Sequence, residues 1–192
     1  MTKTRKQHPL LSCVCLLLLL AVCITILPRA YTCFYEAAYP RHYSDAVEQA
    51  AKDTGIPSSL IYAVIHTESN FDPNAISSAN AKGLMQLTDE TFRWALQREG
   101  TDKDAPADLF DPAVNIRYGG YVLTLLREQF SDTNTMLAAY NAGQGRVKDW
   151  LADPLYSSDG ITLKTIPIEE TDQYIKRVNA AREQYQKLYN LD

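Results

Sequence analysis

The strongest constraint on this chain is an apolar run near its start. The eighteen residues from Leu10 to Leu27 carry no charge, and five consecutive leucines lie at their centre. As a helix this run would be roughly 27 Å long, close to the ~30 Å thickness of the hydrocarbon core of a bilayer. Lys3, Arg5 and Lys6 precede the run, and no acidic residue does. We therefore expect a membrane-spanning helix whose basic end faces the cytoplasm.

A cleaved signal peptide is the alternative interpretation of this run. The apolar core of such a peptide usually has about 7–15 residues and leads to a cleavage site with small residues. Here the run is longer, and both Ala30-Tyr31-Thr32 and Leu20-Ala21-Val22-Cys23 are poor matches to cleavage sites. We favour a retained anchor, with the remainder of the chain outside the cytoplasm; secretion after cleavage is the alternative.

The remainder of the chain reads as a linker and one domain. We expect an anchor over residues 1–28, a linker over 29–43 and a folded domain over 44–192. Tyrosines recur every four residues between 31 and 43, which fits an interfacial linker or one face of a short helix. Roughly 150 residues are enough for one hydrophobic core.

Hydrophobic periodicity predicts an all-α domain. Gly55 is placed to end a helix, Pro57 suits the first turn of the next, and Asp111-Pro112 is an N-cap followed by a first helical residue. The predicted helices cover 44–54, 57–69, 89–99, 111–130, 134–141, 145–151 and 169–191. Only 160–163 resembles a strand.

Charge and cysteine usage exclude several classes of function. The four cysteines, at 13, 15, 23 and 33, all precede the domain, so neither a disulfide framework nor a thiol nucleophile is expected. The three histidines do not cluster with cysteines, so we expect no metal and no cofactor. Without Lys3, Arg5 and Lys6 the chain has 16 basic and 23 acidic residues, a net charge of −7. This charge argues against nucleic-acid binding, and the sequence identifies no partner protein.

Glu68 lies at the end of an otherwise apolar helical face. Leu60, Val64 and Glu68 are spaced at i, i+4 and i+8, so the carboxyl group continues a core stripe. Burial disfavours the charged form of a carboxyl group and raises its pKa toward the range that a general acid needs. Asn70 and Pro73 end the helix just afterwards, where a cleft can form. A glutamate that only bonds nearby groups at a helix end is the alternative.

Two later segments combine polar groups with a glycine. Gly83 permits a tight backbone turn, and Gln86 carries an amide that can donate and accept hydrogen bonds. Tyr140 and Asn141 precede Gly143, which we expect to end a short helix. A core tyrosine with a satisfied hydroxyl is the alternative for Tyr140.

These segments, in this order, resemble the lytic transglycosylases of the SLT family, which cut the glycan strands of bacterial peptidoglycan. The resemblance extends from about Ala46 to about Tyr189 and implies a lysozyme-like single domain. It is carried by Glu68-Ser69-Asn70-Phe71, Gly83-Leu84-Met85-Gln86-Leu87 and Ala138-Ala139-Tyr140-Asn141-Ala142-Gly143. A weaker match covers Ile166 to Tyr174. Thr88-Asp89 departs from the Met-Pro that the family commonly has after the glutamine, and reads as a helix start.

The resemblance implies that Glu68 is catalytic and that five residues bind substrate: Ser77, Gln86, Tyr140, Asn141 and Glu170. Judged by residue type alone, Ser77 is better explained as a cap or turn residue. Glu170 fits the N-terminal acid of a helix equally well.

The chemistry implied by the resemblance needs a single acid. Hydrolytic glycosidases usually place a second carboxyl group about 5–10 Å from the first, but Asp72 fits a turn, and Asp89 and Glu90 fit a first helical turn. The resemblance implies that Glu68 protonates the glycosidic oxygen and then deprotonates the C6 hydroxyl, which closes a 1,6-anhydro ring on N-acetylmuramic acid. Muramidase hydrolysis is one alternative. A membrane-held glycan-binding protein with little turnover is the other.

The apolar run generates a prediction about the cellular protein. A retained anchor buries its leucines in lipid, so the protein should keep its full mass of 21.6 kDa and resist extraction by salt or high pH. Fractionation with mass determination checks this. A soluble form that begins after Tyr31 would show a cleaved signal instead.

Overall fold

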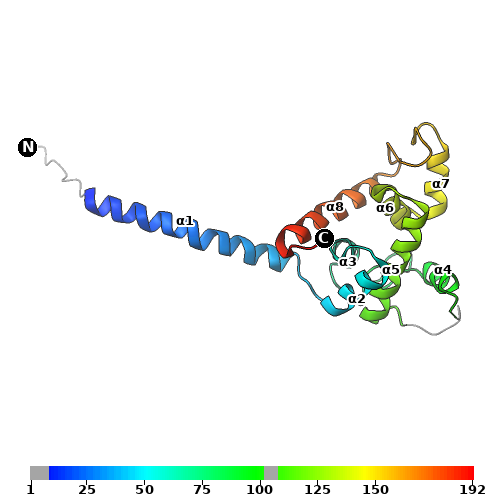
Figure 1. The fold of residues 1–192 in the computed structure, drawn as a ribbon, viewed down its shortest axis with the longest axis horizontal. Helices are drawn as coiled ribbons and strands as arrows, with labels where there is room; N and C mark the ends of the chain where they lie inside the picture. The colour runs from blue at the N-terminus through cyan, green and yellow to red at the C-terminus, as the bar shows by residue number, and fades with distance from the viewer. Residues whose placement is uncertain (1–8, 102–107) are drawn as a thin grey trace, which may run out of the picture. The chain divides into compact units, whose positions relative to one another are not determined.

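The computed structural model describes residues 9–101 and 108–192, and the chain divides into two units, Met1–Pro40 and Arg41–Asp192. The first unit contains one helix, α1 (Pro9–Ala38) (Figure 1). Within it, Cys13–Ala38 is long and apolar enough to cross a membrane, which is a statement about length and composition. Because α1 continues to Ala38, the rings of Tyr31 and Tyr35 lie on a helix, with centroids 4.4 Å apart. Tyr31 and Tyr35 thus share a helical face, whereas Tyr39 and Tyr43 lie beyond the end of α1.

The second unit is built from helices, as the sequence predicted. They are α2 (Ser44–Thr54), α3 (Ser58–Ser69), α4 (Asp89–Glu99), α5 (Pro112–Gln129), α6 (Thr133–Ala142), α7 (Gln144–Ala152) and α8 (Glu169–Tyr189). The strand predicted over 160–163 is wrong: the described residues contain no strand there, only an isolated bridge between Ser157 and Leu163. Asp159 accepts backbone hydrogen bonds from Ile161 and Thr162, which folds this stretch into a loop.

Local signals set most of the helix ends. Gly55 and Asn70 end α2 and α3 in the left-handed region, with φ of 64° and 49°. At the starts of α4 and α5, the side chains of Thr88 and Asp111 accept hydrogen bonds from backbone N–H groups of the first turn. The predicted N-cap at Asp111 is therefore confirmed.

Helix α3 forms the centre of the domain. Every residue from Ser58 to Ile65 is buried, and the helix packs against α8 and α2 (Figure 1). A helix that is buried all around keeps its axis and its end in place through packing on several sides. Glu68, in the last turn of α3, is therefore carried by a helix that is buried over most of its length.

A turn from Lys82 to Leu87, called the 82–87 turn below, follows α3 in the chain and is held by α5. Buried Asn115 accepts a hydrogen bond from the Met85 N–H at 2.7 Å. Its amide donates to the carbonyls of Lys82 (2.9 Å) and Leu109 (2.8 Å). All the hydrogen-bonding groups of this side chain are thereby used on backbone. Gly83, with φ of 73°, lets Asn115 approach this closely.

This packing generates a stability prediction. A Cβ at position 83 would lie 2.3 Å from the Leu109 carbonyl oxygen and 2.4 Å from the Asn115 amide nitrogen, whereas a Cβ at Gly100, with a similar φ of 77°, would meet no atom of the described residues within 4 Å. Gly100→Ala should cost only the left-handed backbone penalty of about 1–2 kcal/mol. Gly83→Ala should cost clearly more, because the Asn115 contacts must also be displaced. Unfolding of the full chain in detergent measures both losses, and equal losses would contradict this account of the turn.

Candidate active site

The carboxyl group of Glu68 lies in the last turn of α3, mostly shielded from solvent. Burial raises its pKa from 4.5 to about 7, while the nearby Tyr174 hydroxyl and the positive charge of Arg177 offset part of the rise. Near neutral pH the group is therefore divided between its protonated and charged forms. Such a group can donate a proton and take one back at the same pH.

Glu68 opens into a groove of about 430 Å³. The lining comes from the end of α3, the loop that follows it, the start of α4, α5, the α6–α7 junction and the start of α8. The groove contains all six residues predicted for the site: Glu68, Ser77, Gln86, Tyr140, Asn141 and Glu170. Residues more than a hundred positions apart in the sequence thus share one cavity.

Two tyrosine hydroxyls lie beside Glu68. The Tyr140 hydroxyl donates to the Met85 carbonyl at 2.7 Å. The Tyr174 hydroxyl is buried and meets no group in hydrogen-bond geometry within the described residues. Burial and the nearby Glu68 carboxylate both raise the pKa of each tyrosine well above 10, so both hydroxyls stay neutral. Neither hydroxyl therefore competes with Glu68 for ionisation near neutral pH.

Tyr174 is not among the site residues predicted from the sequence, where it only ends the weaker match that begins at Ile166. Tyr174 is one helical turn after Glu170, a residue that lines the groove. That i, i+4 spacing is the signal that could have placed its hydroxyl near the site.

The 82–87 turn holds Gln86 in the groove. Its amide nitrogen donates to the carbonyls of Ala75 (3.1 Å) and Gly83 (2.9 Å), and its φ is 51°. Both amide hydrogens are thus used within the protein, and only the amide oxygen remains for a ligand. The sequence had suggested that this amide could both donate and accept. Ser69, next to Glu68, donates to the Leu84 carbonyl at 2.8 Å and ties the turn to α3.

Asn141 and Ser77 have the opposite hydrogen-bonding capacity. The Asn141 amide oxygen accepts a hydrogen bond from the Thr171 hydroxyl at 2.8 Å, which leaves its NH₂ group for a ligand. The Ser77 hydroxyl accepts from the Ala81 N–H at 3.1 Å and keeps its own hydrogen. The Ser77 hydroxyl therefore stabilises the turn as an acceptor and can still donate a hydrogen bond to a ligand.

Among the acids predicted in turns or helix starts, Asp72 and Glu170 differ in their relation to the groove. Asp72 accepts a hydrogen bond from the Asn74 N–H at 2.9 Å and is a turn residue, as expected. Glu170 lies in the first turn of α8, as expected of a helix N-terminal acid, and it also lines the groove; its contact with substrate stays a prediction.

The departure at Thr88-Asp89 is accommodated by new contacts. Thr88 caps α4, and Asp89 forms an ion pair with Lys82 at 2.7 Å. This pair joins the first residue of the 82–87 turn to the start of α4. These contacts therefore keep the wall of the groove in place, but with the polar side chains of Thr88 and Asp89 where the family commonly has Met-Pro.

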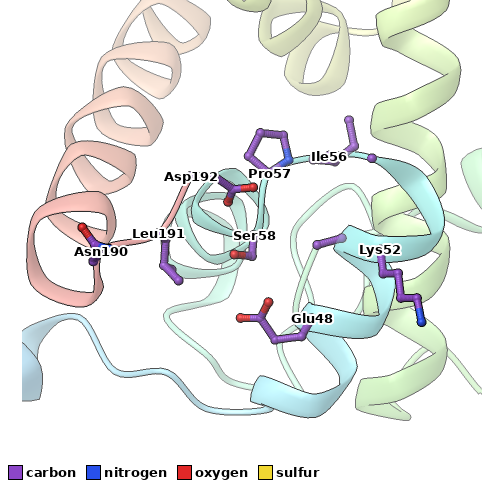
Figure 2. Close-up of a pocket in the computed structure, with 10 residues that line it drawn as sticks. Glu48, Lys52, Ile56, Pro57, Ser58, Asn190, Leu191 and Asp192 are labelled. Carbon is purple, nitrogen blue, oxygen red and sulfur yellow. The ribbon is translucent and has the colours of Figure 1, made fainter.

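A second pocket, also of about 430 Å³, lies at the other end of α3 (Figure 2). Glu48 and Lys52 of α2, Ser58 of α3 and the segment Asn190–Asp192 line it. The Ser59 hydroxyl donates to the Asp192 carbonyl there. None of the six predicted site residues contributes to this pocket, so it is separate from the candidate active site.

The raised pKa of Glu68 generates a prediction about stability. The folded state holds a proton that the unfolded state releases between pH 4.5 and about 7. The associated stability is therefore complete below pH 4.5 and lost as pH rises through 7. Relative to Glu68→Gln, which cannot titrate, the wild type should lose about 3 kcal/mol of unfolding free energy over this window. Denaturation of both proteins across pH checks this; parallel curves would show an ordinary, solvated carboxyl group.

Comparison with known proteins agrees with this geometry. The family model described as "Transglycosylase SLT domain" matches residues 45–158. The chain is 32% identical over 148 residues to the soluble lytic murein transglycosylase of Escherichia coli strain K12, an alignment that covers 76% of this chain and 23% of that protein. It is 33% identical over 170 residues to the membrane-bound lytic murein transglycosylase C of Actinobacillus pleuropneumoniae, with 76% of this chain and 46% of that protein covered.

Solved structures show the same fold. The lytic transglycosylase Slt of Pseudomonas aeruginosa, solved as an inactive mutant, superposes with a TM-score of 0.67 at 36% identity and covers 78% of this chain and 25% of its own. The 70-kDa soluble lytic transglycosylase in complex with bulgecin A gives 0.68 at 30% identity, covering 80% and 25%. The predicted lysozyme-like, all-α fold is thus confirmed. The chain spans less than half the length of these relatives, and it belongs to the transglycosylase SLT domain family.

Proposed function

We propose that this chain is a membrane-held lytic transglycosylase that cleaves peptidoglycan between N-acetylmuramic acid and N-acetylglucosamine. The proposal depends on one observation: Glu68, with a pKa of about 7, lines the same groove as the other five predicted site residues. The relatives named as lytic murein transglycosylases support the same activity.

In the proposed reaction Glu68 acts twice. Its protonated form gives a proton to the glycosidic oxygen, and the bond from that oxygen to C1 of N-acetylmuramic acid breaks. The acetamido group of that sugar stabilises the positive charge at C1. The Glu68 carboxylate then takes the proton of the C6 hydroxyl while its oxygen bonds to C1. A 1,6-anhydro ring closes, no water is consumed, and Glu68 is again protonated.

The remaining site residues hold the strand for this reaction. The Gln86 oxygen can only accept and the Asn141 NH₂ can only donate, a pair that matches the N–H and C=O of an acetamido group. Ser77 supplies a donor and Glu170 an acceptor at the walls of the groove. Tyr140 and Tyr174 lie near Glu68 and stay neutral in both steps.

The proposed location follows from α1 and from the charge of the sequence before it. Cys13–Ala38 can span a bilayer, and the basic residues that precede it belong on the cytoplasmic side. Residues 44–192 would then act on peptidoglycan outside the cytoplasm. The membrane-bound relative supports a membrane location.

The reaction is tested by its products and by loss of Glu68. Full-length protein in detergent should convert purified peptidoglycan into fragments with 1,6-anhydro ends, read by mass spectrometry. Glu68→Gln should lower the rate at least about a hundredfold, because general acid catalysis typically contributes 10²–10⁴-fold. Glu169→Gln is the matched control, since Glu169 begins α8 beside Glu170 but does not line the groove.

Three outcomes would contradict the proposal. Reducing ends would indicate hydrolysis, and binding without products would indicate a glycan-binding protein. Residual activity of Glu68→Gln above about a tenth of the wild type would remove Glu68 from the catalytic step.

A further inference from the structure

A pair of threonine hydroxyls forms part of the groove at the start of α4. Thr88 and Thr91 both line the groove, and both are half-buried. The Thr88 hydroxyl donates to the Thr91 hydroxyl at 2.9 Å and accepts the Thr91 N–H at 3.1 Å. Val122, another lining residue, is only 2% exposed. The pair thus adds polar groups to a groove that also has an apolar lining residue.

Hydrogen-bond accounting shows what this pair leaves unused. The Thr88 hydroxyl donates its hydrogen to the Thr91 hydroxyl and accepts a hydrogen bond from the Thr91 backbone N–H. Thr91 then uses its oxygen as an acceptor, and within the described residues its hydroxyl hydrogen meets no other protein acceptor. A hydroxyl has one donor and two acceptor sites. The Thr91 hydrogen is therefore available to a molecule in the groove.

Thr88 also fixes the direction of this donor. Because the Thr88 hydroxyl caps α4 through the Thr91 N–H, its own position is set by the helix. The ion pair between Lys82 and Asp89 ties the same helix start to the 82–87 turn. The Thr91 hydroxyl is thus held in advance of binding, which reduces the entropy lost when a ligand is bound.

We propose that Thr88 and Thr91 form a sugar-binding element in which Thr91 donates a hydrogen bond to an acceptor oxygen of the glycan strand. The oxygen belongs either to an acetamido carbonyl or to a sugar hydroxyl. This inference rests on the proposed function and adds specificity-determining residues to it. Thr91 contributes to binding and has no part in proton transfer.

Thr91→Val and Thr91→Ser separate binding from structure. Valine keeps the shape of threonine, and the cap of α4 survives because it uses the backbone N–H of residue 91. Serine restores the hydroxyl. A site built to bond a polar group loses affinity when its donor is removed, by about tenfold for one hydrogen bond.

The test measures kcat/KM for strand cleavage and the melting temperature of full-length protein in detergent. We expect Thr91→Val to lose about tenfold in kcat/KM, mainly through KM, and Thr91→Ser to stay within about twofold of the wild type. Melting temperatures should be unchanged. If Thr91→Val matches the wild type, or if Thr91→Ser is as impaired as Thr91→Val, the proposed donor is ruled out.

A binding comparison keeps this test independent of the reaction. In a Glu68→Gln background, adding Thr91→Val should weaken binding of uncleaved strands by a similar factor; equal affinities would overturn the inference even if cleavage occurs as proposed. Strands with N-deacetylated glucosamine identify the acceptor. Loss of the Thr91→Val effect on these strands assigns the acetamido carbonyl of N-acetylglucosamine, and persistence of the effect assigns another acceptor oxygen of the strand.

Discussion

The site depends on how the backbone of the 82–87 turn is held. Three side chains from three helices fix it: Ser69 of α3, Asn115 of α5 and Tyr140 of α6. A backbone group left unpaired in such a buried place would cost about 1–3 kcal/mol, so each bond strongly favours this one conformation. Because Ser69 adjoins Glu68 and Tyr140 lines the groove, the turn connects Glu68 to the wall of the groove. The position of Gln86 is a consequence of this network.

The same packing creates a conflict at Glu68. The buried helix α3 excludes solvent from the carboxyl group, and this desolvation disfavours the charge that the second half of the proposed reaction needs. Tyr174 and Arg177 moderate the effect, so the group stays near the pH at which both forms are accessible. A fully apolar setting would hold the proton too firmly, and a solvated one would lose it. Because the charged form of Glu68 is disfavoured in the folded state, the free energy of unfolding is lower at neutral pH than it would be for a solvated carboxyl group.

Much of the fold and the identity of the acid could be predicted from local patterns. The i, i+4, i+8 spacing that ends in Glu68 is a property of one helix, and so are the caps at Thr88 and Asp111. Contacts between distant residues could not be predicted in this way. The spacing of residues in the sequence does not indicate the three hydrogen bonds of Asn115. Nor does it indicate that both Gln86 amide hydrogens are used within the protein. The family resemblance brought the six site residues together, but which of their donors and acceptors stay available follows only from the folded network.

The central claim is that Glu68 is a buried acid that titrates near neutral pH. Infrared difference spectra between the wild type and Glu68→Gln, recorded across pH, report the C=O band of this one protonated carboxyl group. The account predicts a band that disappears with a midpoint at about pH 7. A midpoint near 4.5, the ordinary value for glutamate, would contradict it.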